Sequence, residues 1–141
     1  MRKSIVIILA ASMVLFLAAC SSSDGKTVFD LIKESPAAKM ELPDGSFTYV
    51  DSEISSLRSF ADLELRESPV EPADSEEDWL YRIVFNPAGK VEGTDEITVS
   101  FHGDYVQIDT EYYLPKDGVS YESILDWAAS KYEYFMGYSG K

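Results

Sequence analysis

The sequence predicts an α+β fold in which an antiparallel sheet of about four to six strands packs against two helices, the last of them at the C-terminus. Residues 96–101 and 105–109 alternate polar and apolar side chains around a Gly-containing turn, which is the pattern of a β-hairpin. Residues 120–136 carry apolar side chains at three- and four-residue spacing, as in an amphipathic helix. The chain has 141 residues, a length that suits a single domain with its own core.

Candidate strands are segments rich in β-branched or aromatic residues, or of alternating polarity, that turn residues bound. They cover residues 38–42, 47–50, 63–66, 79–85, 96–101, 105–109 and 112–114. The turn Pro43-Asp44-Gly45-Ser46 joins the first two into a hairpin, and His102-Gly103-Asp104 joins 96–101 to 105–109. Residues 68–78 are acidic and contain prolines, so we expect an exposed loop there.

Two helices are expected besides an ambiguous first element. Residues 27–34 suit a short helix capped by Thr27, or a first strand. Asp51 or Ser52 is expected to cap a helix that runs to about Ala61. The last helix is expected to begin at Ser120 and to end at Gly137. Its apolar stripe, which should cover the sheet, consists of Tyr121, Ile124, Leu125, Ala128, Tyr132 and Phe135.

The first nineteen residues have the layout of an export signal. Arg2 and Lys3 precede an uncharged run, residues 5–19, in which Ser12 is the only polar side chain. A helix over this run would measure about 22 Å, which is short of the ~30 Å hydrocarbon core of a bilayer. A permanent transmembrane helix is therefore the weaker interpretation.

The run ends in Leu17-Ala18-Ala19-Cys20, which resembles the lipobox of bacterial lipoproteins. The resemblance implies that the chain is cut before Cys20 and that a lipid on the Cys20 sulfur anchors it outside the cytoplasmic membrane. With Ser21 after the Cys, a gram-negative host is expected to sort it to the outer membrane. The alternative is an ordinary secretory signal cut at an Ala-x-Ala-like site. The predicted organisation is a signal peptide over 1–19, a lipidated Cys and flexible tether over 20–26, and one acidic domain over 27–141.

The charge of the chain narrows the classes of partner. The net charge is −13, and loss of Arg2 and Lys3 with residues 1–19 would leave 10 of the 12 basic side chains against 25 acidic ones. A polyanion such as nucleic acid would be repelled by this surface. Cys20 is the only Cys, so the domain has no internal disulfide and depends on its core.

The search for chemistry yields no catalytic or metal-binding constellation and no cofactor motif. The single His, His102, is expected at a hairpin tip as a solvated turn residue, where nothing would orient it for a catalytic triad. One His cannot supply a zinc site. The acidic loop 71–78 offers oxygen ligands for calcium but lacks the order of ligands of a known binding loop.

Aromatic residues at the C-terminal end are the remaining candidates for function. Trp127, Tyr134 and Tyr138 are expected to form a binding surface, because Trp127 and Tyr134 lie off the apolar stripe of the last helix. The sequence therefore favours a non-catalytic module that binds a protein, peptide or wall component. Two alternatives stay open: an acid-based hydrolase acting on cell-wall material, and an inhibitor or immunity-type protein for a basic partner.

Overall fold

The computed structural model describes residues 26–72 and 78–138. Along the chain, its elements are α2 (Val28–Lys33), β1 (Ala38–Glu41), β2 (Phe47–Val50), α3 (Ser55–Arg58), the 3₁₀ helix η2 (Ser59–Asp62), β3 (Leu65–Glu67), β4 (Tyr81–Phe85), β5 (Ile97–Phe101), β6 (Val106–Ile108), β7 (Glu111–Pro115) and α4 (Tyr121–Met136). The predicted signal peptide over 1–19, Cys20 and nearly all of the tether lie outside the described residues and stay predictions.

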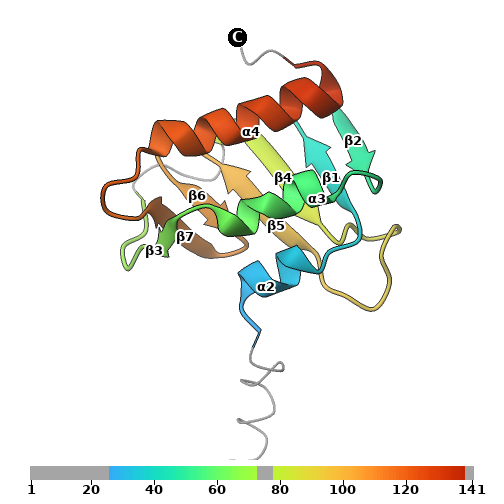
Figure 1. The fold of residues 1–141 in the computed structure, drawn as a ribbon, viewed down its shortest axis with the longest axis horizontal. Coiled ribbons are helices and arrows are strands. Elements are labelled where there is room, and N and C mark those ends of the chain that lie inside the picture. The colour runs from blue at the N-terminus through green and yellow to red at the C-terminus, as the bar shows by residue number, and fades with distance from the viewer. Residues whose placement is uncertain (1–25, 73–77, 139–141) are drawn as a thin grey trace, which may run out of the picture.

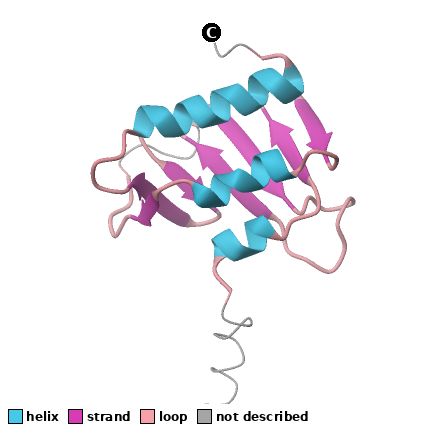
Figure 2. Ribbon diagram, viewed as in Figure 1, coloured by secondary structure: helices cyan, strands magenta, loops and turns pink. Residues whose placement is uncertain are grey.

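The strands form one antiparallel sheet in the order β2-β1-β4-β5-β6-β7-β3. Figure 1 shows α2, α3 and α4 on one side of this sheet, and Figure 2 shows the same two layers by element type. The expected α+β class is confirmed. Within the described residues the sheet has seven strands rather than the expected four to six, and three α-helices rather than two.

The core lies between the sheet and the helices. The strand residues that face the helices are almost fully buried, among them Met40, Ile83, Val99 and Phe101 at 0% exposure. Phe60 from η2 inserts among them and packs edge-on against Phe101, with ring centroids 5.7 Å apart. The side of the sheet that bears Val99, Phe101, Val106 and Ile108 is therefore the side that the helices cover, as the stripe on the last helix predicts.

Local signals explain where the first and last helices begin and end. The Thr27 side chain accepts from the Asp30 N–H while Asp30 accepts from the Thr27 N–H, so α2 starts with a complete capping box. The Ser120 side chain accepts from the Glu122 N–H at the start of α4. Gly137 ends α4 in the left-handed conformation, with φ 69°. These boundaries confirm the expected caps, and the first element is the helix rather than the strand.

The helix expected after residue 52 is shorter than its apolar spacing predicts. Glu53 adopts a left-handed conformation with φ 62°, so helical geometry cannot start before it. Ile54 is the N-cap and gives no side-chain hydrogen bond, so the capping role expected of Asp51 or Ser52 is wrong. The segment then divides into α3 and the tighter η2.

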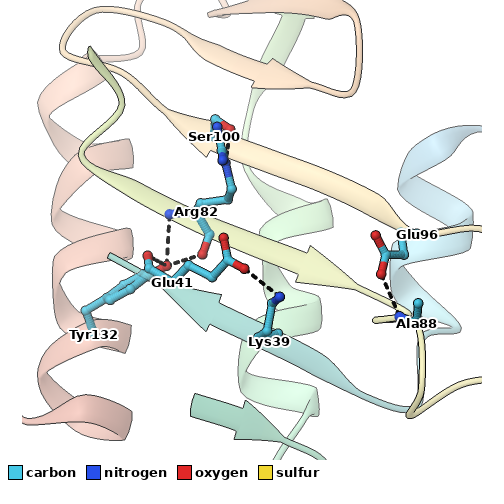
Figure 3. Close-up of polar contacts among 7 residues, drawn as sticks. All are labelled: Lys39, Glu41, Arg82, Ala88, Glu96, Ser100 and Tyr132. Atoms are coloured by element: carbon cyan, nitrogen blue, oxygen red, sulfur yellow. Dashed lines mark hydrogen bonds and ion pairs between the residues drawn. The ribbon is translucent and has the colours of Figure 1, made fainter. Parts of the chain in front are cut away.

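One tyrosine ties the last helix to the sheet. Tyr132 in α4 is fully buried, and its hydroxyl accepts from the Arg82 N–H at 2.9 Å. The same hydroxyl donates toward the carbonyl oxygens of Glu41 and Arg82. It thus joins the ends of β1 and β4 to the helix, as Figure 3 shows. Burial raises the pKa of this phenol well above its usual value, so the group remains protonated and able to donate.

Across the ranges that the structure describes, no helix has both the length and the apolar character needed to span a bilayer.

Candidate functional site: the open face of the sheet

The side of the sheet away from the helices carries most of the polar strand residues. Because strand side chains alternate between the two faces, the register places one side chain from each of six strands in a row across this face. In sheet order from β2 to β7, the row is Phe47, Glu41, Arg82, Ser100, Gln107 and Tyr112. A second, shorter row contains Tyr49, Lys39, Val84 and Thr98. We call this side the open face; its exposed part is at β2, whereas Val84, Ser100 and Gln107 are buried.

Arg82 is the central cation of the open face. Its Nε donates to Ser100 Oγ on the neighbouring strand at 2.9 Å, which fixes the direction of the guanidinium (Figure 3). The guanidinium carbon lies 4.1 Å from the centre of the Trp79 ring, a cation–π contact. Among the described residues, no carboxylate oxygen lies within 4.0 Å of an Arg82 nitrogen. The terminal guanidinium nitrogens therefore keep donors for an anionic ligand.

Two lysines lie over the aromatic rings of β2. Lys39 Nζ lies 5.7 Å from the centre of the Phe47 ring, and Lys90 Nζ lies 4.9 Å from that of Tyr49. Lys39 also pairs with Glu41 at 2.6 Å (Figure 3), and this hydrogen bond raises the pKa of the ammonium group. Lys90 has no such ion pair within the described part of the chain. Its charge is thus the more available of the two.

These side chains form two groups on the open face: the lysines over the rings of β2, and Arg82 over Trp79 on the side toward β5. We define the cation–aromatic patch as Lys39, Phe47, Tyr49, Trp79, Arg82 and Lys90. Phe47 and Tyr49 are 56% and 43% exposed, which is unusual for large apolar side chains. Three positive charges, of which Lys39 is paired with Glu41, lie on this face of a chain whose net charge is −13. Aromatic faces beside cations are suited to binding an anionic or extended polar ligand by contact and charge.

The residues expected to bind from the sequence differ in their exposure and contacts. Trp127 is half-buried: its ring packs on Phe60 and Phe101, and its Nε1 donates to Ser59 Oγ at 3.1 Å. Tyr134 is 66% exposed. Tyr138 packs edge-on against Tyr81, with ring centroids 6.3 Å apart. Trp127 thus packs against the core while part of its side chain stays exposed. The expectation that it lies off the packed side of the helix is wrong.

A polar hollow of about 430 Å³ lies between α3 and α4. It is lined by Glu53, Ser55, Ser56, Ser130, Lys131 and Tyr134. Tyr134 donates to Glu53 Oε1 and Lys131 donates to Ser56 Oγ, both at 2.9 Å, so its polar groups largely satisfy one another. The hydrogen bond to Glu53 raises the pKa of Tyr134. Glu53 is the one carboxylate in this lining, whereas a glycosidase needs a pair.

His102 is buried rather than solvated, so the expectation of an exposed turn residue is wrong. It is 2% exposed, and its ring stacks on that of Tyr105 at 4.2 Å with an angle of 9° between the planes. The Tyr121 hydroxyl donates to the carbonyls of both residues, which closes this corner from the helix side. Burial disfavours the charged imidazole and lowers the pKa of His102. The residue therefore contributes a neutral packed ring.

Metal ligands do not gather in the described ranges, where no three His, Cys, Asp or Glu side chains form a cluster able to hold an ion. Of the loop 71–78 expected as a calcium candidate, residues 73–77 lie outside the described residues. The carboxylate of Glu71, which is described, accepts a hydrogen bond from the Tyr112 hydroxyl at 3.3 Å. The calcium hypothesis therefore stays a prediction.

The sequence contained a signal for the open face that the search for chemistry did not use. Residues 38–41 alternate apolar and polar, and the turn at 43–46 pairs Lys39 with Tyr49 and Glu41 with Phe47, so these four side chains share a face. Aromatic side chains on the side opposite the core are the informative feature. Arg82 and Trp79 were hidden, because their position depends on the long-range pairing of β4 with β1 and β5.

Comparison with known proteins identifies no relatives: no family model, curated protein or solved structure matches this chain significantly.

Proposed function

We propose that this chain is a non-catalytic interaction module, anchored outside the cytoplasmic membrane through a lipid on Cys20, that binds its ligand on the open face. The observation that carries the binding role is the cation–aromatic patch, in which Lys39, Lys90 and Arg82 each lie over an aromatic ring. The lipobox resemblance of residues 17–20 supports the anchor. The ligand classes are those expected from the sequence, namely a protein, peptide or wall component.

The patch favours binding over structural support alone. An aromatic ring that only stabilised the fold would be buried against the helices, as Phe60 and Phe101 are. Phe47 and Tyr49 instead present their rings to solvent at the edge of the sheet. Exposed aromatic and Arg side chains are enriched where proteins bind partners, because they combine contact area with directed polar groups.

The binding role is tested by capture from an envelope extract, with the full-length chain held in detergent micelles. The patch variant carries Phe47→Ser, Tyr49→Ser and Arg82→Ala, and the matched control carries Tyr134→Ser and Tyr138→Ser, which alters exposed aromatics of the helical side. We expect a ligand that the parent and the control retain and the patch variant loses. Retention by the patch variant together with loss by the control would move the site to the helical surface.

The anchor is tested separately. We expect the parent chain to incorporate a labelled fatty acid and to sediment with membranes, and the variant Cys20→Ser to do neither. Incorporation of label into Cys20→Ser would contradict the predicted attachment point.

A further inference from the structure

We propose that the free edge of β2 binds an acidic, extended peptide as an additional antiparallel strand. This inference rests on the proposed function and names the chemical class of the partner. It follows from three features of β2, taken in turn: its backbone, its sequence and the charges beside it.

The backbone of β2 has hydrogen-bonding groups that point away from the sheet. Among the described strands, β2 is outermost and its only neighbour is β1. The Leu42 N–H donates to the Ser46 carbonyl at 2.9 Å, and the register continues with Met40 opposite Thr48 and Ala38 opposite Val50. Antiparallel strands alternate between hydrogen-bonded and non-bonded pairs. Phe47 and Tyr49 therefore direct their N–H and C=O groups outward, where a further strand would pair with them.

The sequence of β2 lacks the usual protection of a free edge. Natural proteins block outer strands with charged residues, prolines or bulges that prevent pairing with another chain. Phe47-Thr48-Tyr49-Val50 contains no charge and no proline, and it consists of residues with high strand propensity. Its short length is the only protective device in the strand itself. An edge of this kind is a template for an added strand.

The charges beside β2 select the partner. Lys39 and Lys90 both lie over rings of this strand, and since Lys39 is paired with Glu41, the ammonium group available to a neighbouring residue is that of Lys90, over Tyr49. A basic strand would be repelled there, whereas Glu or Asp would be attracted. A second copy of the chain is disfavoured, because two domains with a net charge of −13 each would approach along this edge. At physiological salt, charges more than about 8 Å apart are largely screened from one another. A short acidic peptide is therefore repelled only by the acidic side chains close to the edge, and not by the net charge of the whole domain.

The geometry also fixes the pattern of the peptide. Every strand pair in the sheet is antiparallel, and the added strand continues that arrangement. Residues directly opposite Phe47 and Tyr49 share their face and exchange both backbone hydrogen bonds with them. Acidic residues are thus expected opposite Phe47 and Tyr49. The alternate residues face the helical side beside Val50, which is only 4% exposed, so apolar side chains suit them.

The probe is a fluorescent ten-residue peptide in which Glu and Val alternate, titrated against the full-length chain in detergent micelles. Fluorescence anisotropy should show saturable binding. N-methylation of the Glu residues should weaken binding about tenfold or more, because it removes at least two backbone hydrogen bonds, whereas N-methylation of the Val residues should leave the affinity within about twofold. Equal effects of the two modifications, the reverse pattern, or no binding of the Glu-Val peptide would overturn strand addition by an acidic peptide.

Charge is tested with a matched pair of lysine variants. Lys90→Glu should weaken binding of the Glu-Val peptide severalfold, whereas Lys116→Glu, the same charge change in an exposed loop after β7, should leave it near the parent value. A Lys-Val peptide that binds more tightly than the Glu-Val peptide would overturn the charge argument. A dimer of the full chain that the Glu-Val peptide disperses, and that Tyr49→Lys abolishes, would assign the edge to a second copy instead.

The two proposals fail in different ways. If the patch variant loses its envelope ligand while the Glu-Val peptide fails to bind the parent, the open face is a binding surface for some other class, such as a wall polysaccharide. If the peptide binds with the expected dependence on N-methylation but no envelope ligand depends on the patch, the edge can add a strand and the proposed function is wrong.

Discussion

The two faces of this sheet differ in what their side chains contact. On the covered face, side chains such as Met40, Ile83 and Val99 are inaccessible to solvent and pack against the helices. On the open face the same strands present Lys39, Glu41 and Arg82. Covered residues contribute by removing apolar surface from water, at about 25 cal/mol per Å². On the open face Ser100 and Gln107 are buried as well, whereas Phe47 and Tyr49 on β2 are exposed and should be replaceable without unfolding the domain.

Stability and binding are therefore expected to separate by face. A substitution on the covered face should act on the free energy of unfolding, and a substitution at the solvent-exposed edge of the open face should act on ligand affinity. Tyr132 and His102 fit neither kind of substitution alone. The buried hydroxyl of Tyr132 binds the backbone of Arg82, whose side chain is on the open face, and the buried ring of His102 stacks on Tyr105.

The largest expected effect is that of Phe60→Ala on the covered face. Phe60 is fully buried and packs on Phe29, Phe101 and Trp127. Truncation should lower the free energy of unfolding by about 3–5 kcal/mol, because it removes a large apolar side chain and leaves a cavity. Urea denaturation followed by tryptophan fluorescence measures this loss. A change below about 1 kcal/mol would mean that the helices can close over the gap.

Tyr132→Phe should have the next largest effect. It retains the ring but removes the hydroxyl that joins Arg82 and Glu41 to α4. The expected loss is about 1–3 kcal/mol, because buried backbone groups lose a partner. The same denaturation measurement applies, with the exposed Tyr134→Phe as the control for loss of a hydroxyl on the same helix. Equal losses for the two variants would show that burial of the hydroxyl is irrelevant.

His102 should make stability depend on pH. Burial lowers its pKa below the ordinary 6.5, so between that value and the folded-state pKa the unfolded chain binds a proton that the folded chain does not. Stability should therefore fall as the pH drops below about 6.5, by at most about 1.4 kcal/mol for each pH unit. Chemical denaturation at pH 7.5 and 5.5 should show a larger difference for the parent than for His102→Phe. An unchanged difference in the variant would assign the effect to the carboxylates.

Tyr49→Ser should have the smallest effect on stability. Its ring is 43% exposed and contacts Phe47 and Lys90, so the free energy of unfolding should change by about 0.5 kcal/mol or less. Affinity for the Glu-Val peptide should nevertheless fall severalfold. Thermal denaturation and anisotropy on the same preparation test the two statements together. A stability loss as large as that of Tyr132→Phe would remove the distinction between the faces.

The elements of this fold were largely accessible from the sequence because their signals are local. The hairpin of β5 and β6 and the last helix with Ser120 and Gly137 follow from alternation, spacing and capping residues within a few positions. The helix after Asp51 was misjudged, because the left-handed backbone of Glu53 has no signature in side-chain spacing. Residue 53 is not Gly, Asn or Asp, so no propensity pointed to it.

The candidate site was less accessible because it depends on pairing between distant segments. Arg82 comes to lie opposite Glu41 through the β1–β4 register, and Lys90 comes to lie over the ring of Tyr49. His102 was misjudged because a turn residue is normally exposed, whereas here its ring stacks on Tyr105 and Tyr121 from α4 binds the backbone of both residues. Long-range contacts of this kind leave no pattern in a window of ten residues.

The Tyr132 hydroxyl has a practical consequence for observing ligands. It binds the peptide groups of Arg82 and Glu41, whose side chains stand on the other side of the sheet (Figure 3). A ligand that shifts the strands at this point must alter the electronic environment of the phenol without touching it. The chemical shift of a ¹³C label at the Tyr132 ring, or the vibrational frequency of its hydroxyl, would thus be a built-in reporter. Ligand binding on the open face could thus be followed from the signal of a buried residue, without a dye attached near the binding site.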